Sequence, residues 1–245
     1  MTDHLRPARV PTLLFYFSAT LLLTLPLAVL VVRSGHWQQG LLLYALACLL
    51  AAITALVLAV LAVLPRYRQQ RSRLFTGLAC ALPGTLLFLS VVAGRGDYPA
   101  IHDITTDLSD PPTFSHAQSL RGPDSNPLDI KPDSLGAQQD AYPDLQSLRS
   151  ERSANNAFRH ALAVADQLGW EITWQDADAW QFEAVDTTAI MAFKDDIAVR
   201  IRSTSEGSVI DLRSVSRVGV GDIGANAKRI RAFQTTFAED QGGQL

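Results

Sequence analysis

The sequence predicts a membrane protein made of three N-terminal transmembrane α-helices and an α+β two-layer domain, with an antiparallel sheet and two helices on one face. Charge and hydropathy divide the chain in the same place. Residues 1–96 hold eight Lys/Arg and one acid, a net charge of +7, and they contain all the long apolar stretches. Residues 97–245 hold thirteen Lys/Arg and twenty-three acids, a net charge of −10, and have the size of one ordinary domain.

Three uncharged apolar stretches are long enough to cross a bilayer. They cover residues 13–32, 41–64 and 74–94. At 1.5 Å per helical residue, each spans a hydrocarbon core of about 30 Å. We therefore expect residues 1–96 to form a three-helix transmembrane anchor. The stretches hold no Asp, Glu, Lys, Arg or His that could carry ions or protons, so the sequence gives no support to a transporter.

The distribution of arginine predicts how the anchor is oriented. Two arginines precede the first stretch and four lie between the second and third, whereas only two lie on the opposite side: Arg6, Arg9, Arg66, Arg68, Arg71 and Arg73 against Arg33 and Arg95. Positive residues stay in the cytoplasm, so the N-terminus is expected there. We expect a bacterial inner (cytoplasmic) membrane protein, with residues 97–245 periplasmic or extracellular and the first stretch retained as an uncleaved anchor.

Cysteine and histidine usage argues against a metal or redox site. Cys48 and Cys80 both lie in apolar stretches, so residues 97–245 have no cysteine and no disulfide. The five histidines show no metal-ligand spacing. An acidic exported domain also repels a phosphate backbone, so we expect no nucleic-acid partner, no metal and no cofactor.

Residues 97–148 form an extended N-terminal arm in this interpretation. They hold seven of the twelve prolines, and these break regular structure. Apolar residues are nevertheless spaced through the segment: Ile101, Ile104, Phe114, Leu120, Tyr142 and Leu145. We therefore expect the arm to lie ordered on the sheet, despite its proline content.

The rest of the exported part predicts one helix, four or five strands and a second helix. The first helix starts at Ser153 as its N-cap and ends at Gly169. Alternating or apolar segments follow at residues 170–174, 180–184, 190–193, 197–202 and 209–215. The last helix runs from about residue 222 to residue 238. Strands joined by such short connections must be antiparallel.

Gly219, Gly221 and Gly224 form a literal G-x-G-x-x-G between a strand and a helix. In a dinucleotide fold such glycines let a pyrophosphate approach a helix N-terminus. Here a hairpin precedes them, only 21 residues follow Gly224, and Asp222 would repel a phosphate. We interpret Asp222 as the cap of the last helix and expect no nucleotide cofactor.

The hairpin of residues 197–215 carries the candidate binding cluster. A turn centred on Glu206-Gly207 would pair Arg200 with Arg213 and would put both on the face opposite the core. This arginine cluster could bind an anion, or Asp103, Asp107 and Asp196 could neutralise it and fasten the arm to the sheet. The candidate residues are Asp195, Asp196, Arg200, Arg213, Arg217, Asp222 and Asn226.

Catalytic groups are present but have no pattern that joins them. His102-Asp103 could supply a general base with its carboxylate, and Ser214 or Ser216 could supply a nucleophile. Adjacent residues on a strand point to opposite faces, so this spacing predicts no triad. The catalytic residues are therefore left unknown.

The segments FKDDIAVRIR and DLRSVSRVGVGDIGANAKRIRAF resemble the signature of the domain of unknown function 1499 family. IHDITTD, DPPTF and QQDAYPDL resemble the arm of that family. The resemblance implies a membrane-associated protein with no assigned activity, and an arm that belongs to the domain. Its implied signature positions are Asp195, Asp196, Arg200, Arg213, Ser214, Ser216, Arg217, Gly219, Asp222, Gly224, Asn226 and Arg229.

The sequence favours a membrane-anchored envelope protein that acts as a non-catalytic binding or scaffolding module. Its expected partners are the lipid bilayer and another envelope protein. The alternative is an envelope hydrolase or transferase that uses the Arg/Asp/Ser face of the sheet. An enzyme would show these groups converging on an empty pocket, whereas a scaffold would show them bonded to one another.

Overall fold

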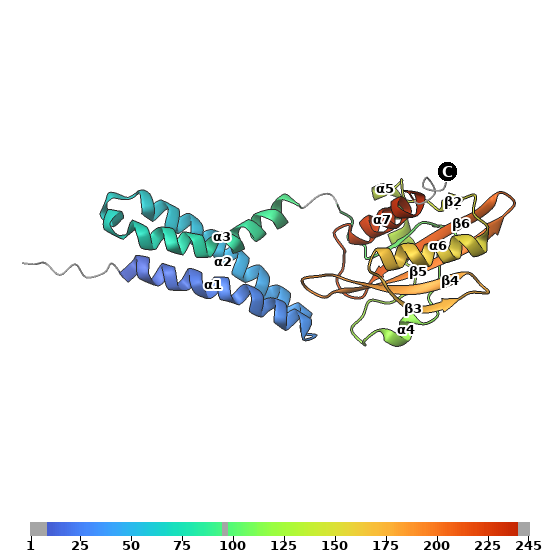
Figure 1. Ribbon diagram of the computed structural model, residues 1–245. Helices are drawn as coiled ribbons and strands as arrows, with labels where there is room; N and C mark the ends of the chain where they lie inside the picture. The colour runs from blue at the N-terminus through green and yellow to red at the C-terminus, as the bar shows by residue number, and fades with distance from the viewer. Residues whose placement is uncertain (1–8, 95–97, 240–245) are drawn as a thin grey trace, which may run out of the picture. The chain divides into compact units, whose positions relative to one another are not determined.

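A computed structural model describes residues 9–94 and 98–239 (Figure 1). The chain divides into two compact units, Met1–Gly96 and Asp97–Leu245. The first is helical and the second is an α+β domain, and each is described by itself below. The predicted fold class, three long apolar helices followed by an antiparallel sheet with two helices on one face, is confirmed.

The first unit contains three helices that are long and apolar enough to cross a membrane. They are α1 (Arg9–Arg33), α2 (Trp37–Val63) and α3 (Arg71–Ala93), and a 3₁₀ helix, η1 (Pro65–Gln70), leads into α3. Glycines let the helices approach closely: a Cβ at Gly84 would lie 2.7 Å from that of Ala51. The anchor is therefore compatible with a lipid bilayer. Arg6 and Arg95, which entered the charge count, lie outside the described residues.

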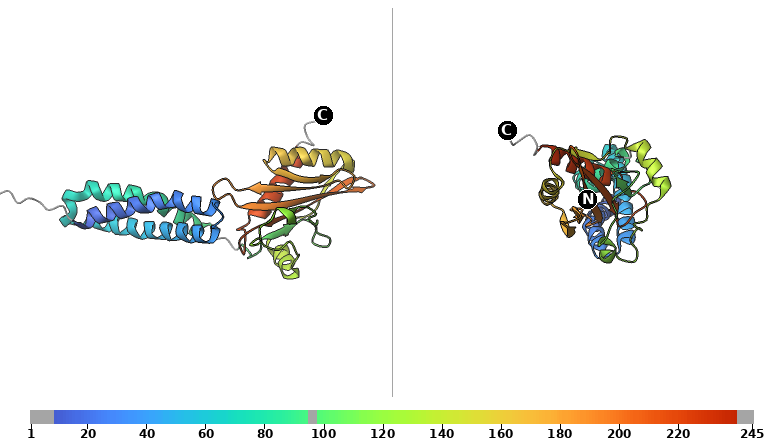
Figure 2. Two further views of the ribbon diagram at one scale, coloured as in Figure 1. Left: turned by 90° about the horizontal axis from the view of Figure 1, so that it is seen from below. Right: turned by 90° about the vertical axis from the view of Figure 1, so that its right-hand side faces the viewer.

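The domain is built on one antiparallel sheet with the order β1-β6-β5-β4-β3, and β2 also pairs with β6. Helices α6 and α7 cover one face of this sheet, which we call the helix face. The arm covers the opposite face, which we call the arm face; the left view of Figure 2 shows α6 and the green arm on opposite sides of the strands. The elements are β1 (Asp103–Thr105), α4 (Ala117–Leu120), α5 (Pro132–Ala141), β2 (Leu148–Ser150), α6 (Ala154–Gln167), β3 (Glu171–Asp176), β4 (Gln181–Thr187), β5 (Lys194–Thr204), β6 (Gly207–Ser216) and α7 (Ala225–Glu239).

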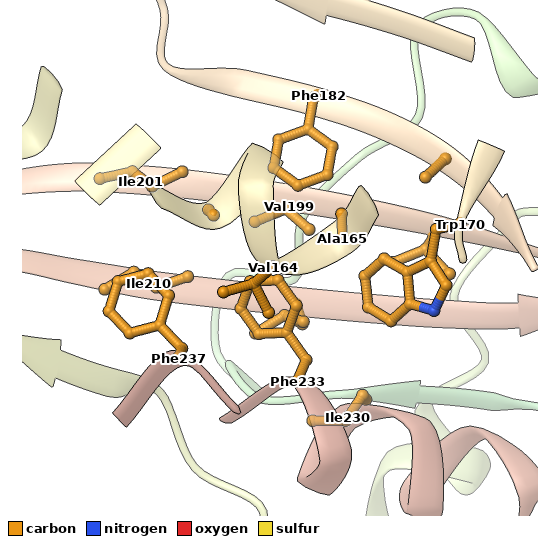
Figure 3. Packing of buried hydrophobic residues seen from close by; sticks show 14 of the residues in the cluster. Val164, Ala165, Trp170, Phe182, Val199, Ile201, Ile210, Ile230, Phe233 and Phe237 are labelled. Atoms are coloured by element: carbon orange, nitrogen blue, oxygen red, sulfur yellow. The ribbon is translucent and has the colours of Figure 1, made fainter. Parts of the chain in front are cut away.

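The apolar core lies between the helix face and the two helices. Phe182, Val199, Ile201 and Ile210 project from the strands toward α6 and α7 (Figure 3). Phe233 of α7 is fully buried and stacks on Trp170 with ring centroids 5.4 Å apart. The alternation of β5 and β6 explains this packing, because every second residue of each strand faces the helices.

Helix ends explain part of the local folding. Gly169 follows the end of α6 with φ +78°. The Gly169 amide donates to the Asp166 carbonyl, and the Trp170 amide donates to the Ala165 carbonyl. This is the Schellman arrangement that a glycine favours. Ser153 occupies the N-cap position of α6, but its hydroxyl makes no capping bond.

Two strands that the sequence did not predict are β1 in the arm and β2 at its C-terminal end. Both strands pair with β6. Strand β1 pairs with residues 213–215 of β6, and β2 pairs with residues 208–210 of β6. Between them, the Thr106 amide bonds the Leu212 carbonyl at 2.9 Å. Strands of three residues are too short to show an alternating pattern, so only the tertiary fold identifies them.

The predicted register of the β5–β6 hairpin is wrong by two residues. The turn is centred on Ser205 and Glu206, so Arg200 lies opposite Asp211, and Ala198 lies opposite Arg213. Gly207 ends the turn with φ +136°, and a Cβ there would meet the Ser150 carbonyl at 2.2 Å. Close approach of β2 therefore reserves this position for glycine and fixes the register.

Two further boundaries differ from the sequence prediction. Residues 190–193 belong to the β4–β5 turn, where the Thr188 hydroxyl accepts a bond from the Phe193 amide at 2.9 Å. The last helix starts at Ala225 rather than near residue 222. A turn or loop residue with an apolar side chain looks like part of a regular element when sequence alone is considered.

Candidate functional site

The seven candidate residues do not form one cluster. Asp195 and Asn226 lie on the helix-face side of the sheet, and Asp222 lies in the β6–α7 loop. The arm face carries Asp196, Arg200 and Arg213, with Arg217 following β6 beside them. Neighbouring residues of β5 point to opposite faces, which separates Asp195 from Asp196.

Arg213 is an almost completely buried cation on the arm face. Its side chain is 2% exposed and forms a bidentate pair with Asp103, at 2.9 Å from Nε to Oδ1 and 2.7 Å from Nη2 to Oδ2. It also donates to the carbonyls of Pro112 and Leu128, and it lies 5.3 Å from the centroid of the Phe114 ring. Arg213 therefore joins β6 to three separate parts of the arm.

Asp196 joins the arm to the end of β6 through two arginines. Arg217 binds it bidentately, at 3.0 and 2.7 Å, and Arg121 of the arm contacts its Oδ2. The side chains of Asp196 and Arg121 are 1% and 2% exposed. Burial lowers the pKa of the Arg121 guanidinium below its ordinary value, and the charge of Asp196 opposes this effect.

Asp211 is the centre of a third group on the arm face. It is fully buried and accepts bonds from Arg200 at 3.2 Å and from Arg202 at 2.9 Å. Arg200 also donates to the Asp110 carboxylate, and Arg202 donates to Asp107, each at 2.9 Å. Burial alone would raise the pKa of the Asp107 carboxyl. Hydrogen bonds from Ser109 and from the Asp110 amide, together with the positive charge of Arg202, outweigh this effect, so the pKa lies below its ordinary value.

Glu183 fastens the arm without any arginine, and the sequence analysis missed it. Its buried carboxylate accepts bonds from the backbone amides of Ser115, His116 and Ala117 at the start of α4. An anion is favourable at such a group of amides. The only sequence signal was an acid between the apolar residues Phe182 and Ala184.

Arg229 organises the polar group on the helix face. It donates to Asp186 at 2.7 Å, to Asp195 at 2.6 Å and to the Ser214 hydroxyl at 3.0 Å. It also donates to the Asn226 Oδ1. The Arg229 and Asp195 side chains are 7% and 6% exposed, so this group fixes α7 to the sheet from a largely buried position.

Asn226 is fully buried and fully bonded. Its amide group donates to the His102 carbonyl at 3.1 Å and to the Ser216 hydroxyl at 2.9 Å, and its Oδ1 accepts from Ser214 at 2.7 Å. A buried amide requires such partners. Asn226 therefore links α7 to β6 and to the residue that precedes β1.

The glycine-rich segment forms the loop before α7. Gly219 and Gly224 have φ of +96° and +77°, and Gly221 has no such constraint. The Asp222 carboxylate accepts from the amides of Gly224 at 2.9 Å and Asn226 at 2.7 Å, so it occupies the amides that a phosphate would need. The geometry agrees with the capping interpretation of Asp222.

The candidate nucleophiles and bases are not brought together. Ser214 is fully buried and Ser216 is 6% exposed, and both bond Asn226. His102 contacts the Val220 carbonyl at 3.3 Å, whereas Asp103 is bound to Arg213. Over residues 9–94 and 98–239, no three His, Cys, Asp or Glu residues are grouped in a way that could hold a metal ion.

A cleft of about 860 Å³ lies between the arm and the β5–β6 hairpin, and most of the residues that line it belong to the arm. Its lining includes Arg202, Thr204 and Val209 of the hairpin and Arg149 of β2, and loop residues 106–109 lie on its border. Arg149 is exposed, and within the described part of the chain it has no ion-pair partner. The cleft thus offers one available cation beside polar and apolar groups.

The comparisons with known proteins give a family but no activity. The family described as protein of unknown function (DUF1499) matches residues 103–237, which is more than half of the chain. The chain belongs to this family, as its resemblance to the family signature indicated. No curated protein matches the sequence. The match starts at the first residue of β1, so it includes the arm from residue 103 on, as well as the sheet, α6 and nearly all of α7.

Proposed function

We propose that this member of the family is a non-catalytic binding or scaffolding module, anchored in the bacterial inner membrane with residues 97–245 in the periplasm or outside the cell. One observation carries the proposal: the charged groups of the arm face are bonded to one another and to the arm. Arg213, Arg200 and Arg217 each hold at least one carboxylate. Groups that hold the domain together in this way are not available to a substrate.

The burial of the serines also favours a binding role over the hydrolase or transferase alternative. A nucleophile must reach its substrate and contact a base. Ser214 and Ser216 lie under α7 and bond an amide rather than a histidine or carboxylate. We therefore assign them to the attachment of α7.

The open cleft is the surface that we assign to a partner. Arg149 borders it on a domain whose net charge is −10, and the apolar residues Val209 and Leu145 also line it. Arginine forks suit carboxylates and phosphates. A partner that presents an anionic group next to an apolar one would match this chemistry.

Reversing the charge of Arg149 should reduce binding without destabilising the domain. In Arg149→Glu full-length protein extracted in detergent, we expect the amount of a specifically co-purifying partner to fall about tenfold, because like charges facing each other cost at least about 1.4 kcal/mol. Arg159→Glu on α6 is the matched control, because Arg159 is also exposed. Melting temperatures should stay unchanged for both variants.

Equal retention of partners by the two variants would contradict the assignment of the cleft. Loss of in vivo function in Ser214→Ala or Ser216→Ala with an unchanged melting temperature would instead favour the enzymatic alternative.

The proposed orientation rests on arginine. Arg66 and Arg68 lie in η1, and Arg71 and Arg73 lie in the first turn of α3, so all four are at the same end of the helices. Alkaline phosphatase fused after residue 100 should be active, and a fluorescent protein fused at residue 70 should fluoresce in the cytoplasm. The opposite pattern would place the domain in the cytoplasm and would refute the proposed localisation.

A further inference from the structure

Exposed apolar side chains gather at one end of the domain. Among residues 98–239, the large hydrophobic residues with exposed side chains are Tyr98, Leu120, Ile190, Val220 and Ile223. Ile190, Val220 and Ile223 are 67%, 78% and 70% exposed. Single exposed apolar residues are ordinary on a protein surface, but their concentration in one place is informative.

Four of the five belong to chain segments that meet at the same end of the sheet. Ile190 is in the β4–β5 turn, Val220 and Ile223 are in the β6–α7 loop, and Tyr98 shortly precedes β1 (Figure 1). The pairing Asp103↔Val215 and the bond from the Arg217 amide to the Lys194 carbonyl place these segments together. The β5–β6 turn lies at the opposite end.

Ile223 has a backbone conformation that its side chain opposes. Its φ is +53°, a region that is unfavourable for a β-branched residue. Glycine or asparagine would fit this position with less strain, and the side chain, which is 70% exposed, gains little burial within the domain. The folding of the domain therefore does not explain why this residue is an isoleucine. Contact of its side chain with an apolar environment outside the domain would explain it.

The length of the chain keeps this end of the domain close to the bilayer. The third apolar helix ends at Ala93, and Tyr98 follows after five residues, which can span at most about 18 Å. Strand β5 starts at this end, and its eleven residues extend for about 36 Å toward the β5–β6 turn at the opposite end. The covalent connection therefore starts from the end that carries the apolar side chains.

Two lysines accompany the apolar residues. Lys194 begins β5 and Lys228 lies in the first turn of α7, and both are exposed. They are two of the three lysines in residues 97–245. Apolar tips with lysine and tyrosine beside them suit the headgroup region of a membrane that contains anionic lipid.

We propose that this end of the domain, formed by Tyr98, Ile190, Val220 and Ile223, inserts into the interfacial layer of the lipid bilayer. The domain then has a membrane contact of its own, in addition to the three apolar helices. The contact fixes which surface of the domain faces the membrane, and it directs the β5–β6 turn away from the membrane.

Lipid-based quenching on the full chain tests this contact. The native Cys48 and Cys80 are replaced by alanine, and a single cysteine at Val220→Cys or Ile223→Cys carries an environment-sensitive fluorophore. The protein is placed in vesicles of phosphatidylcholine and phosphatidylglycerol, with and without nitroxide-labelled lipid. Glu206→Cys in the β5–β6 turn is the matched control, because it is exposed at the opposite end.

We expect blue-shifted emission and several-fold stronger quenching by the nitroxide lipid at positions 220 and 223 than at position 206. Equal, water-like emission at all three positions would overturn the proposal. Blue-shifted emission without lipid quenching would also overturn it, because that result would indicate a protein contact at this surface. None of these outcomes depends on the assignment of the cleft or on the absence of catalysis.

Discussion

Replacing Arg213 with alanine is expected to lower the free energy of unfolding of the domain by about 3–5 kcal/mol, the usual cost of breaking a buried ion pair. The side chain is 2% exposed and holds both oxygens of Asp103. Its loss leaves that carboxylate, at 15% exposure, without its counter-charge, and also removes bonds to two arm carbonyls. Chemical denaturation of the full-length protein, followed by tryptophan fluorescence, measures the change.

Arg231→Ala provides the matched control for this prediction. Arg231 also forms a bidentate pair with an aspartate, Asp144, but the two side chains are 43% and 55% exposed. Exposed pairs contribute about 0–1 kcal/mol, so we expect a change of that size. A similar loss in both variants would show that burial of the Arg213 pair does not determine its contribution.

Asp196→Asn is expected to destabilise the domain by a similar amount, about 3–5 kcal/mol. The substitution keeps the shape of the side chain but removes the one negative charge that Arg121 and Arg217 share. Two guanidiniums, 2% and 13% exposed, would then lie together without that charge. Equilibrium unfolding again provides the measurement.

Asp110→Asn serves as the control for Asp196→Asn. Asp110 also accepts a bond from an arginine, Arg200, but its side chain is 71% exposed. We expect at most about 1 kcal/mol of destabilisation there, because water replaces the lost contact. If Asp196→Asn proves equally mild, the arginines around it must be stabilised by something other than its charge.

The membrane anchor and the two domain helices could be predicted because each depends on a local pattern. Bilayer thickness sets the length of an apolar helix, and a helix that packs on one face repeats its apolar residues every three or four positions. α6 follows this rule, with Ala157, Phe158, Ala161 and Ala165 buried against the sheet. No tertiary information was required for either inference.

The faces of the hairpin were predicted correctly even though its register was not. Side chains alternate with a period of two, so a shift of two residues leaves every side chain on the same face and changes only its partner. Burial patterns therefore cannot distinguish the two registers. What decides between them is the approach of β2 to Gly207, a contact between segments far apart in the sequence.

The candidate cluster was only partly predictable for a similar reason. Arg200 and Arg213 do share the arm face, but their partners Asp110 and Asp103 come from the arm. Arg121 and Glu183 were missed, because their contacts join segments more than 60 residues apart. The sequence shows that such charges exist, and only the fold shows which of them meet.

Amide hydrogen exchange of the arm tests most directly whether the charged groups of the arm face serve to hold it. In the unmodified full-length protein, we expect the amides of Thr105, Thr106 and Ala117 to exchange slowly, because each is bonded to the sheet or to a buried side chain. In Arg213→Ala, these amides should exchange much faster while those of α6 stay protected. Fast exchange throughout residues 98–148 of the unmodified protein, or no change on substitution, would contradict the account.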